Sequence, residues 1–100
     1  MASEPEIKTR EKLSLYYRDW CGACFVVKRA IKQLGLEVEL RNVFANDIWY
    51  RQLVTARGRG TVPVLRRDLD DDTTDWMGES RDIVRYLEEY YRNDVEQKSA

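Results

Sequence analysis

The chain has 100 residues and a mass of 11.9 kDa, so we expect one domain and no second catalytic domain. Its 17 basic and 18 acidic residues nearly cancel, which leaves no overall basic field to attract nucleic acid. No apolar run approaches the roughly 20 residues of a membrane span, and the first residues lack a secretory signal. We therefore expect a cytoplasmic protein with neither nucleic acid nor membrane as a partner.

The absence of histidine narrows the chemistry further. Without histidine the chain cannot form Ser/His or Cys/His nucleophile pairs, and most zinc and copper sites are excluded. The sequence therefore predicts no metal site.

The first half of the chain predicts a strand, a helix and a second strand. Residues 1–11 are polar and are expected to form a disordered leader. Apolar residues alternate over 13–17, as in a short strand, and then follow helical spacing over 24–34 up to a capping Gly35. Residues 36–40 alternate leucine or valine with charged residues, which predicts a second strand with one wet face.

The second half predicts a helix and a hairpin. Asn46 or Asp47 can cap a helix that ends in the glycine-rich basic run 56–60. A brief strand over 62–65 and another near 76–77 are joined by an acidic connection, which suggests a hairpin.

A last helix completes the expected domain. Apolar residues recur at helical spacing after Ser80, which is a good N-cap residue, and the polar tail 93–100 is expected to fray. This element order predicts a small α/β sandwich with a mixed sheet over residues 12–92.

The only two cysteines, Cys21 and Cys24, have C-x-x-C spacing where the first strand meets the first helix. The helix N-terminus and nearby Arg18 both favour the Cys21 thiolate, which is the form that attacks disulfides. Cys24 lies on the apolar stripe one turn inside the helix, so it would be shielded and suited to closing a disulfide with Cys21. The pattern indicates redox chemistry, while a metal-binding or inert pair stays open.

Two other features have simpler interpretations. The acidic run 70–72 lacks the ligand spacing of an EF-hand and is interpreted as a solvated turn. Trp49 and Trp76 occupy periodic positions and are expected in the core, whereas Trp20, next to Cys21, could flank a substrate groove.

Three segments in the same order resemble glutaredoxins. They are LSLYYRDWCGACFVVKRAIKQLG with its basic residue Arg18, TVPVL at 61–65, and MGESRDIVRYL at 77–87. The last segment is also similar to glutathione S-transferase N-terminal domains. The resemblance covers residues 12–92 and implies a thioredoxin-like fold with a mixed four-stranded sheet flanked by helices.

The resemblance also implies a glutathione site. Val62 and Pro63 match the family's TVP element, which implies a cis peptide bond and a backbone that pairs with the cysteinyl part of glutathione. Ser80 would accept the γ-glutamyl carboxylate, with Glu79 or Asp82 facing its ammonium group; the plain alternative for Ser80 is an N-cap.

The basic and aromatic residues around Cys21 complete the expected binding site. Arg18 would pair with the glycyl carboxylate. The turn arginines Arg57 and Arg59 could do the same, although solvated charge is the simpler interpretation. The expected glutathione-binding set is Arg18, Trp20, Val62, Pro63, Glu79 and Ser80.

The resemblance implies a monomeric, glutathione-dependent thiol-disulfide oxidoreductase that acts on disulfide or glutathionylated proteins. Cys21 and Cys24 would be its catalytic residues. Many dithiol glutaredoxins have C-P-Y-C, whereas here the motif residues are Gly22 and Ala23, so a [2Fe-2S] cluster shared by two chains stays an alternative. A non-catalytic docking module is another alternative, and a glutathione transferase is less favoured because the chain lacks room for a helical domain.

Overall fold

The computed structural model describes residues 11–99 and shows a mixed sheet flanked by helices. The elements in chain order are β1 (Lys12–Tyr17), α2 (Gly22–Leu34), β2 (Val38–Asn42), α3 (Asp47–Arg57), β3 (Val64–Asp68), β4 (Thr74–Met77) and α4 (Ser80–Ser99). The predicted order of strands and helices is confirmed.

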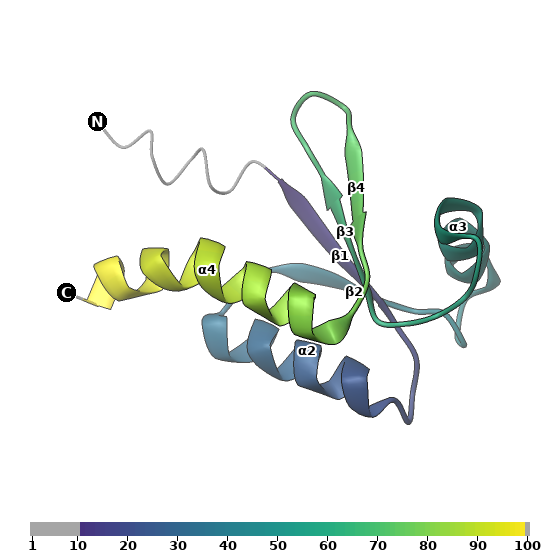
Figure 1. Cartoon of the computed structure of the whole chain (residues 1–100), viewed down its shortest axis with the longest axis horizontal. Helices are drawn as coiled ribbons and strands as arrows, with labels where there is room; N and C mark the ends of the chain where they lie inside the picture. Colours follow the sequence, from purple (N-terminus) through teal and green to yellow (C-terminus); the bar gives the residue numbers. More distant parts are fainter. Residues whose placement is uncertain (1–10, 100) are drawn as a thin grey trace.

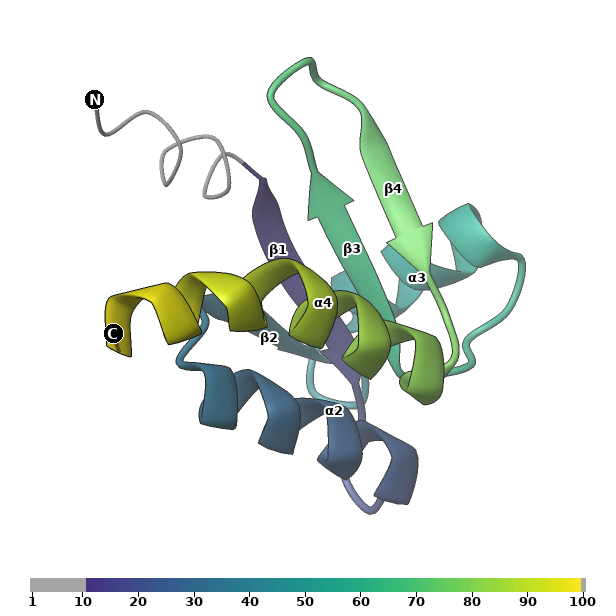
Figure 2. The ribbon, with the colours of Figure 1, turned by 60° about the vertical axis from the view of Figure 1, so that its left-hand side comes forward.

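The four strands form one sheet in the order β2-β1-β3-β4. β1 pairs in parallel with β2, and the crossover between them is α2. β3 pairs antiparallel with both β1 and β4, so the expected hairpin is present. Helices α2 and α4 cover one face of the sheet and α3 lies on the other (Figures 1 and 2). The expected thioredoxin-like fold class is confirmed.

The main core lies between the sheet and the α2–α4 layer. Leu15 of β1, Val27 of α2 and Ile83 of α4 are completely buried there. The alternation of β1 and the helical spacing of α2 and α4 place these side chains on facing surfaces.

A second, smaller core fills the space under α3. Tyr16, Val43, Leu53 and Val64 are buried there, and Trp49, Val62 and Trp76 pack against them. Trp49 and Trp76, both expected in the core, are thus only partly buried and lie at its margin. Because β1 alternates, Leu15 faces α2 and α4 while Tyr16 faces α3.

Several predicted boundaries differ from the structure. β3 runs from Val64 to Asp68 and not over 62–65, because Pro63 has no N–H to donate to a ladder, and β4 already begins at Thr74. β2 begins at Val38, two residues later than expected, because Gly35 caps α2 through a left-handed turn and Leu36 still donates its N–H to Ile31. α4 continues past residue 93 to Ser99. Glu11, placed in the expected leader, has a side chain that is 5% exposed and forms a salt bridge with Arg67; the rest of that leader lies outside the described residues.

None of the helices among residues 11–99 is both long enough and apolar enough to cross a bilayer.

Candidate functional site

Cys21 is the N-cap residue of α2. Its backbone is extended, and its Sγ atom accepts a hydrogen bond from the Cys24 N–H at 3.2 Å. The Cys21 carbonyl accepts the first helical hydrogen bond, from the Phe25 N–H at 3.0 Å. An N–H donor and the positive end of a helix both stabilise negative charge on sulfur. The expected place of Cys21 at the helix N-terminus is confirmed.

Cys24 has a different environment, because its side chain is only 1% exposed. Burial is the main cause that raises the pKa of its thiol from the ordinary 9.0 to about 12, and the hydrogen bond with Cys21 adds to it. Neither cysteine forms a disulfide in this structure. The two thiols are thus a half-buried group at a helix terminus and a buried thiol that stays protonated at neutral pH.

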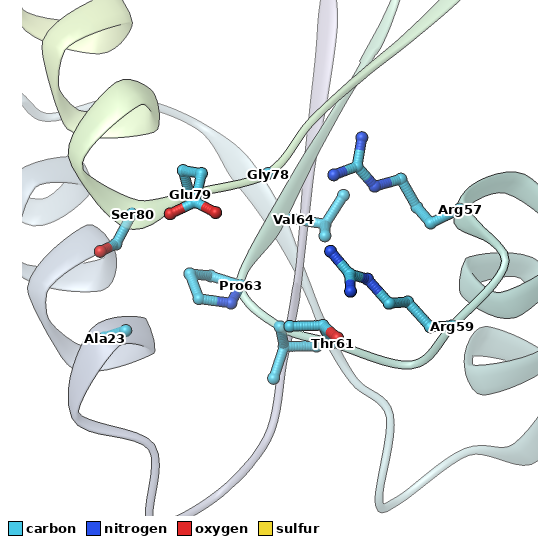
Figure 3. Close-up of a pocket in the computed structure, with 10 residues that line it drawn as sticks. Ala23, Arg57, Arg59, Thr61, Pro63, Val64, Gly78, Glu79 and Ser80 are labelled. Atoms are coloured by element: carbon cyan, nitrogen blue, oxygen red, sulfur yellow. The ribbon is translucent and has the colours of Figure 1, made fainter.

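A cleft beside the first turn of α2 brings together the later motifs of the chain (Figure 3). One wall carries Pro63, Glu79 and Ser80, and the first turn of α2 contributes Ala23. The Val62–Pro63 peptide bond is cis, as the resemblance implied. Of the residues predicted to bind glutathione, Val62, Pro63, Glu79 and Ser80 therefore line one cleft.

The cleft has opposite charges on its two sides. The side chains of Arg57 and Arg59 extend from the end of α3 and the turn after it, facing the wall that carries the Glu79 carboxylate (Figure 3). Glu79 has a left-handed backbone with φ 67°, which is uncommon for a residue other than glycine and marks a constrained position. This arrangement suits a ligand that carries both an ammonium group and carboxylates.

Ser80 is not the N-cap of α4, contrary to the prediction. The Ile83 N–H donates to the Glu79 carbonyl at 3.0 Å, and Ser80 is already the first helical residue. Its position in the first turn leaves its backbone N–H without a partner within the helix. That N–H and the hydroxyl can therefore both serve an anion in the cleft.

Arg18 and Trp20 lie in a neighbouring concavity, which we call the cysteine hollow, lined also by Cys21, Cys24, Phe25 and Lys28. The Arg18 guanidinium donates to the Asp19 carbonyl at 3.2 Å and lies 5.8 Å from the centre of the Phe44 ring. Trp20 is 96% exposed. Neither residue lines the cleft of Glu79 and Ser80, so the predicted glutathione set is divided between two concavities.

Arg57 and Arg59 both line the cleft. The sequence favours solvated charge as the simpler interpretation of these two residues, so their place in the cleft is a difference from the prediction. The Arg57 guanidinium lies so close to Gly78 that a Cβ atom added there would clash with it. A glycine between a strand and a helix was the available signal for this close approach.

Other expected features have plainer outcomes. Asp71 accepts a hydrogen bond from the Thr73 N–H at 3.2 Å in the connection between β3 and β4, so the acidic run belongs to a turn. Among residues 11–91, whose side chains the structure describes, no three His, Cys, Asp or Glu side chains come together as metal ligands would.

The model for the glutathione S-transferase N-terminal domain matches residues 15–94, which is most of the chain. The chain belongs to this family. The match spans most of residues 12–92, the region that resembles glutaredoxins and glutathione S-transferase N-terminal domains. That the protein is specifically a glutaredoxin stays a prediction. No curated protein sequence matches the chain.

Solved structures of glutathione enzymes share the fold. A maleylacetoacetate isomerase from Anaeromyxobacter dehalogenans 2CP-1, with glutathione bound in its active site, superimposes with a TM-score of 0.63 at 26% identity, covering 82% of this chain and 38% of that chain. Glutathione transferase Omega 2S from Trametes versicolor gives a TM-score of 0.66 at 17% identity, covering 83% of this chain and 38% of that chain. This chain thus spans less than two-fifths of the length of either protein, and the second likeness concerns the fold alone.

Proposed function

We propose that this protein is a glutathione-dependent thiol-disulfide oxidoreductase of the glutaredoxin type, with Cys21 as its nucleophile. The observation that carries the proposal is the Cys21 sulfur at the N-terminus of α2, where it accepts the Cys24 N–H at 3.2 Å. This helix terminus favours the thiolate, and the thiolate is the attacking form in disulfide exchange.

Glutathione would occupy the cleft beside the first turn of α2, next to the cysteine hollow that holds Cys21. Ser80 would receive the γ-glutamyl carboxylate through its hydroxyl and backbone N–H, and Glu79 would face the γ-glutamyl ammonium group. The backbone of Val62, next to Pro63, would pair with the cysteinyl part. Arg57 or Arg59 would take the glycyl carboxylate in place of Arg18, because both line the cleft and Arg18 does not.

The reaction proceeds by two exchanges. The Cys21 thiolate attacks the glutathione sulfur of a protein-glutathione mixed disulfide, a new disulfide forms between Cys21 and glutathione, and the protein leaves as a thiolate that takes a proton from water. A second glutathione thiolate then attacks the glutathione sulfur on Cys21, which releases oxidised glutathione and restores the Cys21 thiolate. Overall, one mixed disulfide and one reduced glutathione become one protein thiol and one oxidised glutathione.

The burial of Cys24 favours this glutathione route over a dithiol route. A thiol whose pKa is raised to about 12 is almost entirely protonated at neutral pH, so it attacks disulfides slowly. Cys24 would therefore act as an accessory thiol.

The test is reduction of a mixed disulfide of cysteine and glutathione by the purified protein with excess glutathione. Turnover is expected to be lost in Cys21→Ser and to persist in Cys24→Ser, which is the matched control because it changes the other cysteine. Turnover by Cys21→Ser at the wild-type rate, or no turnover by the wild type, would overturn the proposal.

A second candidate is a glutathione-dependent isomerisation or transfer, which the 26% identity to a maleylacetoacetate isomerase favours. In that role Cys21 would hold the glutathione thiolate by a hydrogen bond and would not form a covalent bond with it. Serine can supply the same hydrogen bond. Under this candidate Cys21→Ser would retain activity toward a maleyl substrate, whereas the oxidoreductase needs the sulfur itself.

A further inference from the structure

An apolar groove runs between α2 and the edge strand β2, which we call the α2–β2 groove. Its floor is formed by Ile31, Leu36, Val38 and Leu40, and Phe25 closes one end. Phe25 is 64% exposed and Leu40 is 43% exposed, so the groove presents apolar surface to solvent. Contiguous exposed apolar surface is typical of interaction sites.

The rim of the groove is positively charged. Lys28, Arg29 and Lys32 come from the α2 side, and among the described residues that line the groove there is no acidic side chain. The nearest glutamate of β2, Glu39, pairs with Arg41 at 3.0 Å. Since strand residues alternate between faces, Glu39 points to the sheet face opposite Val38 and Leu40.

The groove continues into the cysteine hollow. Phe25 and Lys28 line both concavities, and Cys21 lines the hollow. The Lys28 ammonium lies 4.3 Å from the centre of the Tyr17 ring, a cation–π contact that holds it where the two concavities meet. A chain whose cysteine reaches Cys21 can therefore extend along α2 without leaving the apolar surface.

The groove has room for an extended occupant. In the described part of the chain β2 pairs with β1 alone, so no strand lies beyond the groove on that side. Every second side chain of an extended segment that lies along the groove would point into it, and the side chains between them would point outward, past the rim.

We propose that the α2–β2 groove binds the segment flanking the reacting cysteine of a protein substrate, and that this segment is extended, with apolar residues alternating with acidic ones. The apolar side chains would cover the floor and the acidic ones would meet the three cations of the rim. This inference rests on the proposed oxidoreductase function, because it assigns the groove to the substrates of Cys21.

The test measures binding separately from turnover. A fluorescein-labelled peptide in which leucine and glutamate alternate, with serine in place of the reacting cysteine, is titrated with the full chain and followed by fluorescence anisotropy. A second peptide carries lysine in place of every glutamate. We expect the acidic peptide to bind at least about fivefold more tightly, and this preference to shrink as salt is added.

Variants locate the binding surface. Lys32→Glu in the rim and Leu40→Glu in the floor should each weaken binding of the acidic peptide by about fivefold. Arg85→Glu makes the same charge reversal on an exposed residue of α4, outside the groove, and should keep the wild-type affinity. Equal affinity for the two peptides, or equal losses in Lys32→Glu and Arg85→Glu, would overturn the groove assignment.

The two proposals can fail separately. If the protein reduces the cysteine-glutathione disulfide but does not prefer the acidic peptide, the proposed oxidoreductase function stands and the groove assignment is wrong. Binding of the acidic peptide by a protein that reduces no disulfide would overturn the claim that the groove serves substrates of Cys21.

Discussion

Two cysteines only three positions apart have opposite surroundings in this protein. Cys21 caps a helix and lines an open hollow, whereas Cys24 is buried against the core side of the same helix. One helical turn is enough to produce this difference, because the helix terminus stabilises a thiolate and the interior disfavours it. The environment of each sulfur therefore decides its role.

The pKa of Cys24 predicts a loss of stability at alkaline pH. Below the ordinary pKa of 9.0 this thiol is protonated in both the folded and the unfolded chain. Its contribution to the free energy of unfolding therefore does not change with pH in that range. Between 9.0 and about 12 the thiol ionises in the unfolded chain only, so the free energy of unfolding falls as pH rises. For each pH unit in this range the wild type should lose up to about 1.4 kcal/mol more than Cys24→Ser.

Urea denaturation of the two proteins across this pH range provides the measurement. Tyrosines titrate in the same range but are common to both proteins, so the difference isolates Cys24. Parallel pH profiles would contradict the buried, protonated state of this thiol.

The sequence predicts the site unevenly at the scale of single residues. The different environments of Cys21 and Cys24 could be predicted, because the C-x-x-C spacing lies at the start of a stripe of apolar residues at helical spacing. The direction of the Arg18 side chain could not, because it lies in an irregular segment and turns back onto the Asp19 carbonyl. Loop side chains lack the periodicity that fixes the faces of helices and strands.

Helix α3 shows how local capping sets the limits of an element. The Asn46 side chain accepts the Ile48 N–H at 2.8 Å, and Gly58 closes the helix with φ 81°. Within α3 itself only Leu53 is buried. A helix anchored by so few buried residues depends strongly on its caps.

Replacing the cap should therefore have a measurable effect. Asn46→Ala removes the acceptor for the Ile48 N–H and should lower the free energy of unfolding by about 1 kcal/mol. Asn46→Asp keeps an acceptor at the same place and should stay close to the wild type. Chemical denaturation measures the free energy of unfolding of each variant. Equal losses in both variants would show that the side-chain oxygen of residue 46 does not stabilise the helix.

Capping also explains which elements the sequence located well. The limits of α3 follow from Asn46 and from the glycine-rich run after it, both of which are local signals. The start of β2 differs from the prediction because alternation begins at Leu36, before the chain has left the Gly35 turn. Periodicity indicates the type of an element better than its first residue.

At the scale of the whole molecule, Glu11 joins the start of β1 to β3 and α4. Its carboxylate accepts from Arg67 Nε at 2.8 Å and from the hydroxyls of Tyr86 and Tyr91. Burial is the main cause that raises the pKa of each of the two tyrosines well above the ordinary value, and the hydrogen bond to Glu11 adds to it. The three donors leave the buried carboxylate well satisfied.

Loss of this carboxylate should weaken the entire fold. Glu11→Ala leaves the two tyrosine hydroxyls without their acceptor and removes one of the two carboxylates that pair with Arg67. The expected loss is about 3 kcal/mol in the free energy of unfolding. Glu89→Ala, on an exposed position of α4, should change stability by less than about 0.5 kcal/mol. Equal effects of the two substitutions would show that the Glu11 carboxylate does not stabilise the fold.

No local pattern could have indicated this cluster. Glu11 is 75 residues from Tyr86 and 80 from Tyr91 along the chain, and it follows a polar stretch that is typical of a leader. The order of strands and helices could be predicted from patterns within each element, and the family resemblance extended this to the overall fold. Contacts between distant side chains depend on the assembled fold and become visible only in three dimensions.

The almost complete exposure of Trp20 gives the protein an optical probe beside its nucleophile. An indole in water emits at longer wavelength than the half-buried Trp49 and Trp76, which pack against the α3 core. A molecule that settles in the cysteine hollow would displace water from Trp20 and shift its emission to shorter wavelength, while the other two tryptophans go on reporting the state of the fold. Occupancy of the site and integrity of the domain can thus be followed in one unlabelled sample.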